Sequence, residues 1–189
     1  MKIEKIISIT IIVFIVHSLL HEIQIMIYDG NFLTDKINTI AYSLYIPHGS
    51  RILLFLIYGY KSIPGLIIAH VFNGVNNDNF ELFNLTFYMS SFVASLSVPA
   101  GGYLIRVYNK DVINYSGFEI KYLNLITIIS SFINAALSNL IRYFTIFDKN
   151  FDRFYNELIG YIVGDCLGVI VIILSYLFLK RIFYLSIQK

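Results

Sequence analysis

Several residue types are scarce in this sequence. Among 189 residues there is no tryptophan, one cysteine and three prolines, and only 14% of the residues are charged. A single cysteine excludes a disulfide within the chain. The 14 Lys and Arg against 12 Asp and Glu give a net charge of +2, too balanced for a nucleic-acid-binding surface. Without tryptophan, the 15 tyrosines must supply any aromatic belt at a membrane interface.

Sequence signatures of catalysis are also missing. We find no nucleophile elbow, zinc-protease signature, phosphate loop or dinucleotide-binding fingerprint. His17 and His21 have the i, i+4 spacing of metal ligands, but no third ligand completes a set. We expect both histidines to face the interior with hydrogen-bonded partners. The sequence therefore predicts no enzyme, no cofactor and no metal site.

What the sequence has in abundance is apolar residues, which make up 57% of the chain and give a mean hydropathy of +0.71. A soluble domain of this length is usually about 45–50% apolar and about 25% charged. A soluble core cannot hide so much apolar side chain, whereas lipid removes the need to hide it. The composition therefore predicts an all-α, polytopic transmembrane helix bundle in the lipid bilayer, without a separate soluble domain.

Hydrophobic runs of about 20 residues, the length that crosses a bilayer, suggest about six spans in one membrane domain. Pro47 and Gly49 predict a break or re-entrant point in the second span, Pro99 an interruption of the fourth, and Pro64 a helix start. Whether residues 37–46 cross, lie on or re-enter the membrane stays open. The predicted spans cover residues 6–27, 38–60 (broken at Pro47), 62–76, 82–107, 120–144 and 158–179.

The basic residues predict an orientation. With six spans and an inside N-terminus, nine of the 14 Lys and Arg lie on inside faces, four lie outside, and Arg51 lies within the membrane region. Lys and Arg near span ends favour the cytoplasmic side. Both termini are therefore expected in the cytoplasm.

Charged side chains within spans cost roughly 2.5–3.5 kcal/mol each on insertion scales, so each needs a compensating role. In this topology Glu22, Arg51, Arg142 and Asp165 fall in the outer half of the bilayer, and His48 at its outer interface. We interpret these five residues as a ligand-binding group or a buried ion pair.

Arg51 and Asp165 form the predicted focus of this group. Gly164 and Gly168 flank the carboxylate, and small residues let helix backbones approach closely. Because Arg pairs well with a carboxylate, we predict an Arg51–Asp165 contact. The alternative is that this pair only joins two helices. In that case, alanine substitutions would lower thermal stability and leave every activity intact. Asn134, Ser138 and Asn139 are expected to hydrogen-bond between helices, and Cys166 to be a small core residue.

Two blocks of residues resemble a known family. The first has Pro47-His48-Gly49-Ser50-Arg51, an apolar run, then Gly59-Tyr60-Lys61 and Pro64-Gly65; the second is Gly164-Asp165-x-x-Gly168. Their order and separation resemble the bacterial membrane-associated sensor (MASE) domain of the first-described type. That family usually has about eight spans and is fused to a histidine kinase, a diguanylate cyclase or a similar output domain. The resemblance implies a free-standing, shortened sensor module in the bacterial cytoplasmic membrane.

Two functions remain open at this point. One is an integral membrane sensory module that binds an unknown small ligand and signals through a separate partner protein. The other is a small-solute transporter or the substrate-binding subunit of an uptake system. Broken helices such as those expected at Pro47–Gly49 and Pro99–Gly102 often build substrate sites in transporters. A nucleic-acid partner is not expected.

Overall fold

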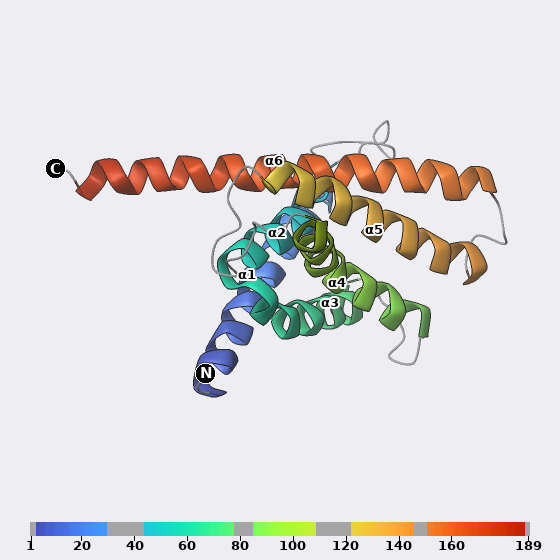
Figure 1. The fold of residues 1–189 in the computed structure, drawn as a ribbon, viewed down its shortest axis with the longest axis horizontal. Coiled ribbons are helices and arrows are strands. Elements are labelled where there is room, and N and C mark those ends of the chain that lie inside the picture. The colour runs from blue at the N-terminus through green and yellow to red at the C-terminus, as the bar shows by residue number, and fades with distance from the viewer. Residues whose placement is uncertain (1–2, 30–43, 78–84, 109–121, 146–150, 188–189) are drawn as a thin grey trace.

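A computed structural model describes residues 3–29, 44–77, 85–108, 122–145 and 151–187 of the chain, and nearly all of them are helical (Figure 1). The predicted stretch 37–46 lies mostly outside the described residues. In chain order the elements are α1 (Ile3–Asp29), α2 (Ile46–Tyr58), the 3₁₀ helix η2 (Gly59–Ser62), α3 (Ile63–Asn77), α4 (Leu85–Tyr108), α5 (Leu123–Thr145) and α6 (Phe151–Ile187).

Four stretches of the described residues are long and apolar enough to cross a membrane: Ile3–Ile27, Ile46–Val75, Leu123–Thr145 and Phe154–Arg181. The all-helical class of the chain is therefore as predicted, and these stretches indicate a membrane protein. The predicted count of six spans is not confirmed: among the described residues, the second and third predicted spans fall within the single stretch Ile46–Val75. α4 is not among the four stretches, because it carries four serines at positions 90, 91, 95 and 97 among its apolar residues.

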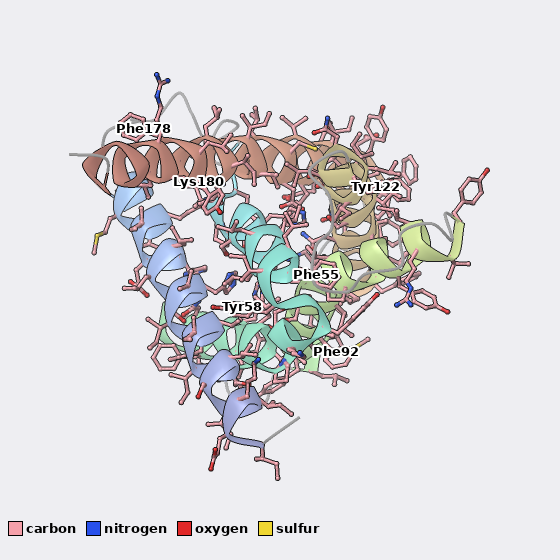
Figure 2. All side chains as sticks on the ribbon, turned by 60° about the vertical axis from the view of Figure 1, so that its left-hand side comes forward. Phe55, Tyr58, Phe92, Tyr122, Phe178 and Lys180 are labelled. Carbon is pink, nitrogen blue, oxygen red and sulfur yellow. The ribbon has the colours of Figure 1, made fainter. Side chains whose placement is uncertain are left out.

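The outside of the bundle is strongly apolar. Large side chains such as Ile11, Phe132 and Leu174 are each more than half exposed. In Figure 2, Phe55 lies among the helices, whereas Phe178 lies on the outer side of α6. The buried side chains, by contrast, include about as many polar as apolar residues. Exposed apolar surface on this scale is typical of contact with lipid rather than water.

The second predicted span is a short helix at the centre of the bundle. α2 has 13 residues and packs against α1, α4, α5 and α6. Nine of its first ten residues, Ile46 to Phe55, are buried. Helix α2 alone is about 20 Å long, which is shorter than the roughly 30 Å hydrocarbon layer.

Gly59 separates α2 from α3. Its φ of 60° lies in the left-handed region that favours glycine, and it ends the α-helix. The chain then makes one 3₁₀ turn, and α3 begins at Ile63 with Pro64 in its first turn. The predicted helix start at Pro64 therefore matches the structure. The Ile46–Val75 stretch is two short helices joined at a turn, and not one continuous rod.

The predicted interruption of the fourth span is wrong. α4 continues from Leu85 to Tyr108 with Pro99 inside it. Pro47, by contrast, follows the non-helical residues Leu44 and Tyr45 and lies in the first turn of α2, where its missing N–H removes no helical hydrogen bond. A proline inside a helix frees one carbonyl but does not have to end the helix, since neighbouring groups can satisfy the carbonyl.

Helices α2 and α6 touch through their backbones. A Cβ added at Gly49 would collide with the carbonyl oxygen of Gly168, and one added at Gly168 would collide with the carbonyl of Tyr45. The Tyr45 N–H donates a hydrogen bond of 2.9 Å to the Gly164 carbonyl oxygen. This approach requires glycine at both positions 49 and 168.

We expect Gly168→Ala to destabilise the bundle, because the new methyl group meets backbone atoms that cannot rotate away. Overpacking of this kind costs about 1–3 kcal/mol. Gly101→Ala is the matched control, since its Cβ would meet Ser130 atoms only at 3.3 Å and 3.4 Å. Thermal unfolding in detergent measures both. Equal melting temperatures for the two variants would contradict the close α2–α6 contact.

Candidate functional site

The start of α2 is fixed by its neighbours rather than by its own capping residue. Tyr45 makes no side-chain cap. Instead, the Gln24 side chain from α1 accepts a 2.7 Å hydrogen bond from the Ile46 N–H and donates one of 2.9 Å to the Leu44 carbonyl. Together with the Tyr45–Gly164 bond, these contacts attach the first turn of α2 to both α1 and α6.

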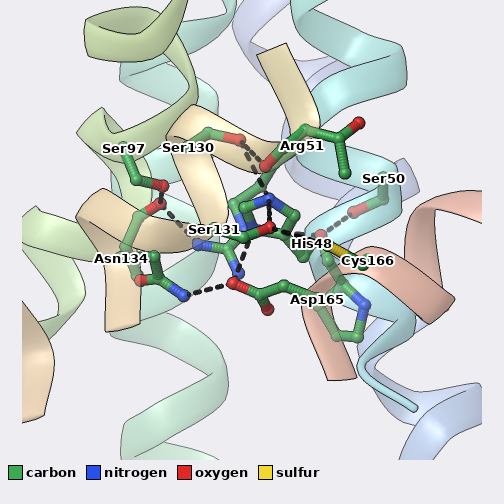
Figure 3. A network of polar contacts seen from close by, with 12 residues as sticks. His48, Ser50, Arg51, Ser97, Ser130, Ser131, Asn134, Asp165 and Cys166 are labelled. Carbon is green, nitrogen blue, oxygen red and sulfur yellow. Dashed lines mark hydrogen bonds and ion pairs between the residues drawn. The ribbon is translucent and has the colours of Figure 1, made fainter. Parts of the chain in front are cut away.

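His48 lies in this first turn and is fully buried among the helices. Its Nδ1 is 3.3 Å from Oδ2 of Asp165 on α6. Its Nε2 is 3.1 Å from Ser130 Oγ and 3.4 Å from Ser131 Oγ, both on α5. If Nδ1 carries the proton toward the carboxylate, Nε2 can accept a hydrogen bond from a serine hydroxyl. His48 thus connects α2 to α5 and α6 (Figure 3).

Asp165 is also fully buried, one turn before Gly168 on α6. Its Oδ2 accepts a 2.9 Å hydrogen bond from Asn134 Nδ2 on α5. This contact agrees with the expected interhelical role of Asn134. The amide of Asn139, by contrast, has no hydrogen-bond partner among the described residues. Ser138 is buried on the same helix.

Arg51 is the largest of the fully buried side chains. Its Nη1 donates a 2.5 Å hydrogen bond to the Ala94 carbonyl on α4, and its Nε a 3.4 Å bond to the Pro47 carbonyl. The guanidinium also lies 5.5 Å from the centre of the Tyr45 ring. The predicted direct Arg51–Asp165 ion pair is wrong, because Arg51 bonds to backbone carbonyls while Asp165 contacts His48 and Asn134.

The Ala94 carbonyl of α4 accepts hydrogen bonds from side chains, although it is not the carbonyl that Pro99 frees. Pro99 supplies no N–H to the carbonyl of Ser95, four residues earlier, and its ring crowds the preceding turn. Ala94 lies in that turn, and its carbonyl accepts bonds from Arg51 and, at 3.0 Å, from Ser97 Oγ. The fourth predicted span thus contributes an acceptor where an interruption was expected.

The network retains unused hydrogen-bonding capacity. Among the described residues, Arg51 Nη2, Asp165 Oδ1 and Asn134 Oδ1 are buried without a hydrogen-bond partner. These atoms come from three helices, α2, α6 and α5. A buried polar group without a partner costs about 1–3 kcal/mol, and more if it is charged. Such a concentration of open donors and acceptors is typical of a place where another polar group binds.

A second polar cluster lies on the other side of α2. Ser50 Oγ is 2.5 Å from His17 Nδ1 on α1, and it also donates to the Pro47 carbonyl at 2.8 Å. The rings of His17 and His70 of α3 lie 4.7 Å apart, centre to centre. No group of three or more metal-ligating side chains gathers in the part of the chain that the structure describes. The two clusters flank α2, with Ser50 facing one and His48 the other.

The remaining predicted site residues lie away from the network. Arg142 is two turns along α5 from Asn134, with its guanidinium 5.2 Å from the centre of the Tyr161 ring. Glu22 is half-buried on α1, five residues after His17. Cys166, by contrast, borders the network: it is partly buried, and its thiol donates a 3.9 Å hydrogen bond to Ser131 Oγ (Figure 3). The structure therefore brings together Arg51, Asp165 and His48, but not Glu22 and Arg142.

Sequence reasoning missed Gln24, Ser50, Ser130 and Ser131. None of them is charged, so none stands out as costly in a membrane. The one available signal was the spacing of polar residues on α5, where Thr127, Ser130, Ser131 and Asn134 lie within two turns and are buried. A polar stripe facing inward predicts polar neighbours on the facing helices.

No family model, curated protein or solved structure matches the chain. The functional interpretation therefore depends on the geometry of the network.

We expect Asn134→Ala to lower the free energy of unfolding by about 1–3 kcal/mol, because Asp165 would lose its best hydrogen bond inside the bundle. Leu137→Ala on the same helix is the control, since Leu137 is 45% exposed and faces outward. Unfolding of both variants in mixed detergent micelles measures the difference. A larger loss for Leu137→Ala would contradict the network.

Proposed function

We propose that this chain is a membrane-embedded sensory module that binds a small polar ligand next to Arg51. The observation that carries the proposal is a fully buried guanidinium that pairs with no carboxylate of the described residues and whose Nη2 has no hydrogen-bond partner among them. A charge enclosed in a membrane bundle is costly and is commonly found where an ion, a substrate or a proton is handled. A ligand that completes the hydrogen bonds of Arg51 recovers part of that cost.

The position of the network also suits signal transmission. The network is formed by side chains of α2, α5 and α6 and by the Ala94 carbonyl of α4, so a bound ligand affects contacts of four helices at once. Asp165 belongs to α6, the longest helix at 37 residues. A change in its contacts shifts the packing of α6 against α2 and α5. We infer that this shift is the signal, and that a separate partner protein receives it.

The finer features of this proposal come from the sequence. They are a topology of about six crossings with both termini in the cytoplasm, a place in the bacterial cytoplasmic membrane, and membership of the membrane-associated sensor family. The two blocks that resemble that family contain the centre of the site. Arg51 and His48 lie in the first block, and Asp165 in the second.

A transporter is the second candidate. It is favoured by the Gly59 break between α2 and α3, and by polar clusters on both sides of α2. Short helices joined at a break in mid-bundle form substrate sites in many transporters. Uptake of a ligand into sealed vesicles would establish transport, whereas binding without uptake supports the sensor.

Hydrolytic catalysis is less well supported, although Asp165, His48 and Ser130 lie in the order of a catalytic triad. Ser130 lies in mid-helix and donates to the Thr127 carbonyl. Backbone N–H groups in the middle of an α-helix are engaged in helical bonds, so they cannot form an oxyanion hole beside this serine. We therefore place these residues in ligand binding and not in acyl transfer.

Ligand binding is tested by screening small polar metabolites for thermal stabilisation of the purified protein in detergent. We expect at least one compound to raise the melting temperature, and Arg51→Gln to abolish the shift. Arg142→Gln is the matched control, because Arg142 lies outside the network and should leave the shift intact. Arg51→Lys keeps the charge and guards against a folding defect. Shifts that persist in Arg51→Gln would contradict the proposed site.

The topology has its own test. We expect a green fluorescent protein fused after Lys189 to fluoresce, and an alkaline phosphatase fused there to be inactive, because only the first folds in the cytoplasm and only the second requires export. An active phosphatase fusion would overturn the proposed orientation.

A further inference from the structure

The open atoms of the network differ in charge. Arg51 Nη2 offers N–H donors with a permanent positive charge, because a guanidinium stays protonated in proteins. Asp165 Oδ1 and Asn134 Oδ1 offer only acceptors. The Asn134 amide donates to Oδ2 of the same carboxylate, so the two open oxygens belong to directly bonded side chains. The site thus has one cationic donor and one acceptor pair.

Arg51 and Asp165 are enclosed in the same bundle without forming an ion pair. Figure 3 shows both side chains directed into one network, although their hydrogen-bond partners are different. Two opposite charges that share a buried region and do not touch are each left undercompensated. A ligand that touches both would satisfy donors and acceptors together.

We propose that the ligand is a small zwitterion with a carboxylate and a primary ammonium group, the chemistry of an α-amino acid. This inference deepens the proposed function and rests on it. The ligand carboxylate accepts hydrogen bonds from Arg51 Nη2. The ligand ammonium donates to Asp165 Oδ1 and Asn134 Oδ1. These are the charge-assisted bonds that carry most strength in a dry environment.

Charge balance favours a zwitterion over simpler ions. An anion alone would pair with Arg51 but bring negative charge toward the Asp165 carboxylate. A cation alone would pair with Asp165 but bring positive charge toward Arg51. A zwitterion adds no net charge to an interior where each uncompensated charge is costly. It also uses all three open atoms.

The surroundings favour a compact ligand. Apolar residues next to the network form a closed core cluster that includes Ile52, Phe55, Val98, Ile126 and Val169. Three of these, Ile52, Phe55 and Val98, have no exposed surface at all. A large ligand side chain would have to displace close-packed groups, which is unfavourable. The smallest amino acids therefore fit best.

The test compares matched probes in thermal unfolding and equilibrium binding with the full chain in detergent. Glycine carries both charged groups, acetate only the carboxylate, and methylamine only the ammonium. Trimethylglycine keeps both charges but lacks N–H donors. We expect glycine or alanine to bind and to raise the melting temperature. The other three probes should bind at least about tenfold more weakly, because each lacks one set of charge-assisted bonds.

Variants locate the effect. Arg51→Gln and Asp165→Asn should each weaken glycine binding, and Arg142→Gln should not. Asp165→Asn preserves the side-chain shape, and Arg51→Lys preserves the charge. We therefore expect at least one substitution at each of the two positions to give a folded protein.

The outcomes separate the two proposals. Binding of acetate as tight as that of glycine, dependent on Arg51, would overturn the zwitterion and leave the ligand-binding function standing. Stabilisation only by metabolites larger than glycine and alanine would also overturn the small zwitterion and leave the ligand-binding function standing. If no compound in a broad metabolite panel binds at all, the proposed function fails together with this inference.

Discussion

The contact between α2 and α6 is the constraint on which the rest of the structure depends. α2 is too short to be held by a long helix–helix seam, so its position comes from backbone atoms that meet across Gly49 and Gly168. This contact sets the first turn of α2 against the middle of α6. His48 directly precedes Gly49, and Asp165 lies one turn before Gly168, so this contact brings the two side chains together. The polar network is thus a product of packing as much as of electrostatic attraction.

The distribution of polarity explains why so much chemistry gathers inside. In lipid, apolar side chains gain little by leaving the surface, so helices associate through close packing and interhelical hydrogen bonds. The serines of α4 and α5 follow this rule. All except Ser90 are buried, and several bond to carbonyls of their own helix, as Ser95 does to Ser91. Serines that bond within their own helix need no other partner, so burying this polar lining costs little free energy. Against that lining, the open atoms of Arg51, Asp165 and Asn134 are exceptions that lie in one network.

Sequence patterns predicted the helical class, the helix start at Pro64 and an interhelical contact of Asn134, because hydropathy, proline and buried amides act locally. They did not predict the partners of Arg51. Charge suggested Asp165, but the nearest acceptor is a backbone carbonyl of Ala94, and an alanine gives no sequence signal. Gln24 also carries no sequence signal, since its role depends on where α2 begins. The prediction also placed too much weight on Pro99, because α4 continues through this residue. Tertiary contacts decided each of these cases.

The length of α6 has a mechanical consequence. The helix spans about 55 Å, nearly twice the roughly 30 Å thickness of a hydrocarbon layer. From Asp165 to the end of α6 at Ile187 is about 33 Å, and the far part of this segment stands clear of the other helices in Figure 1. A rigid rod of that length turns an angular change near its pivot into displacement at its tip. A tilt of about 10° at Asp165 moves the tip by about 6 Å, roughly one helical turn.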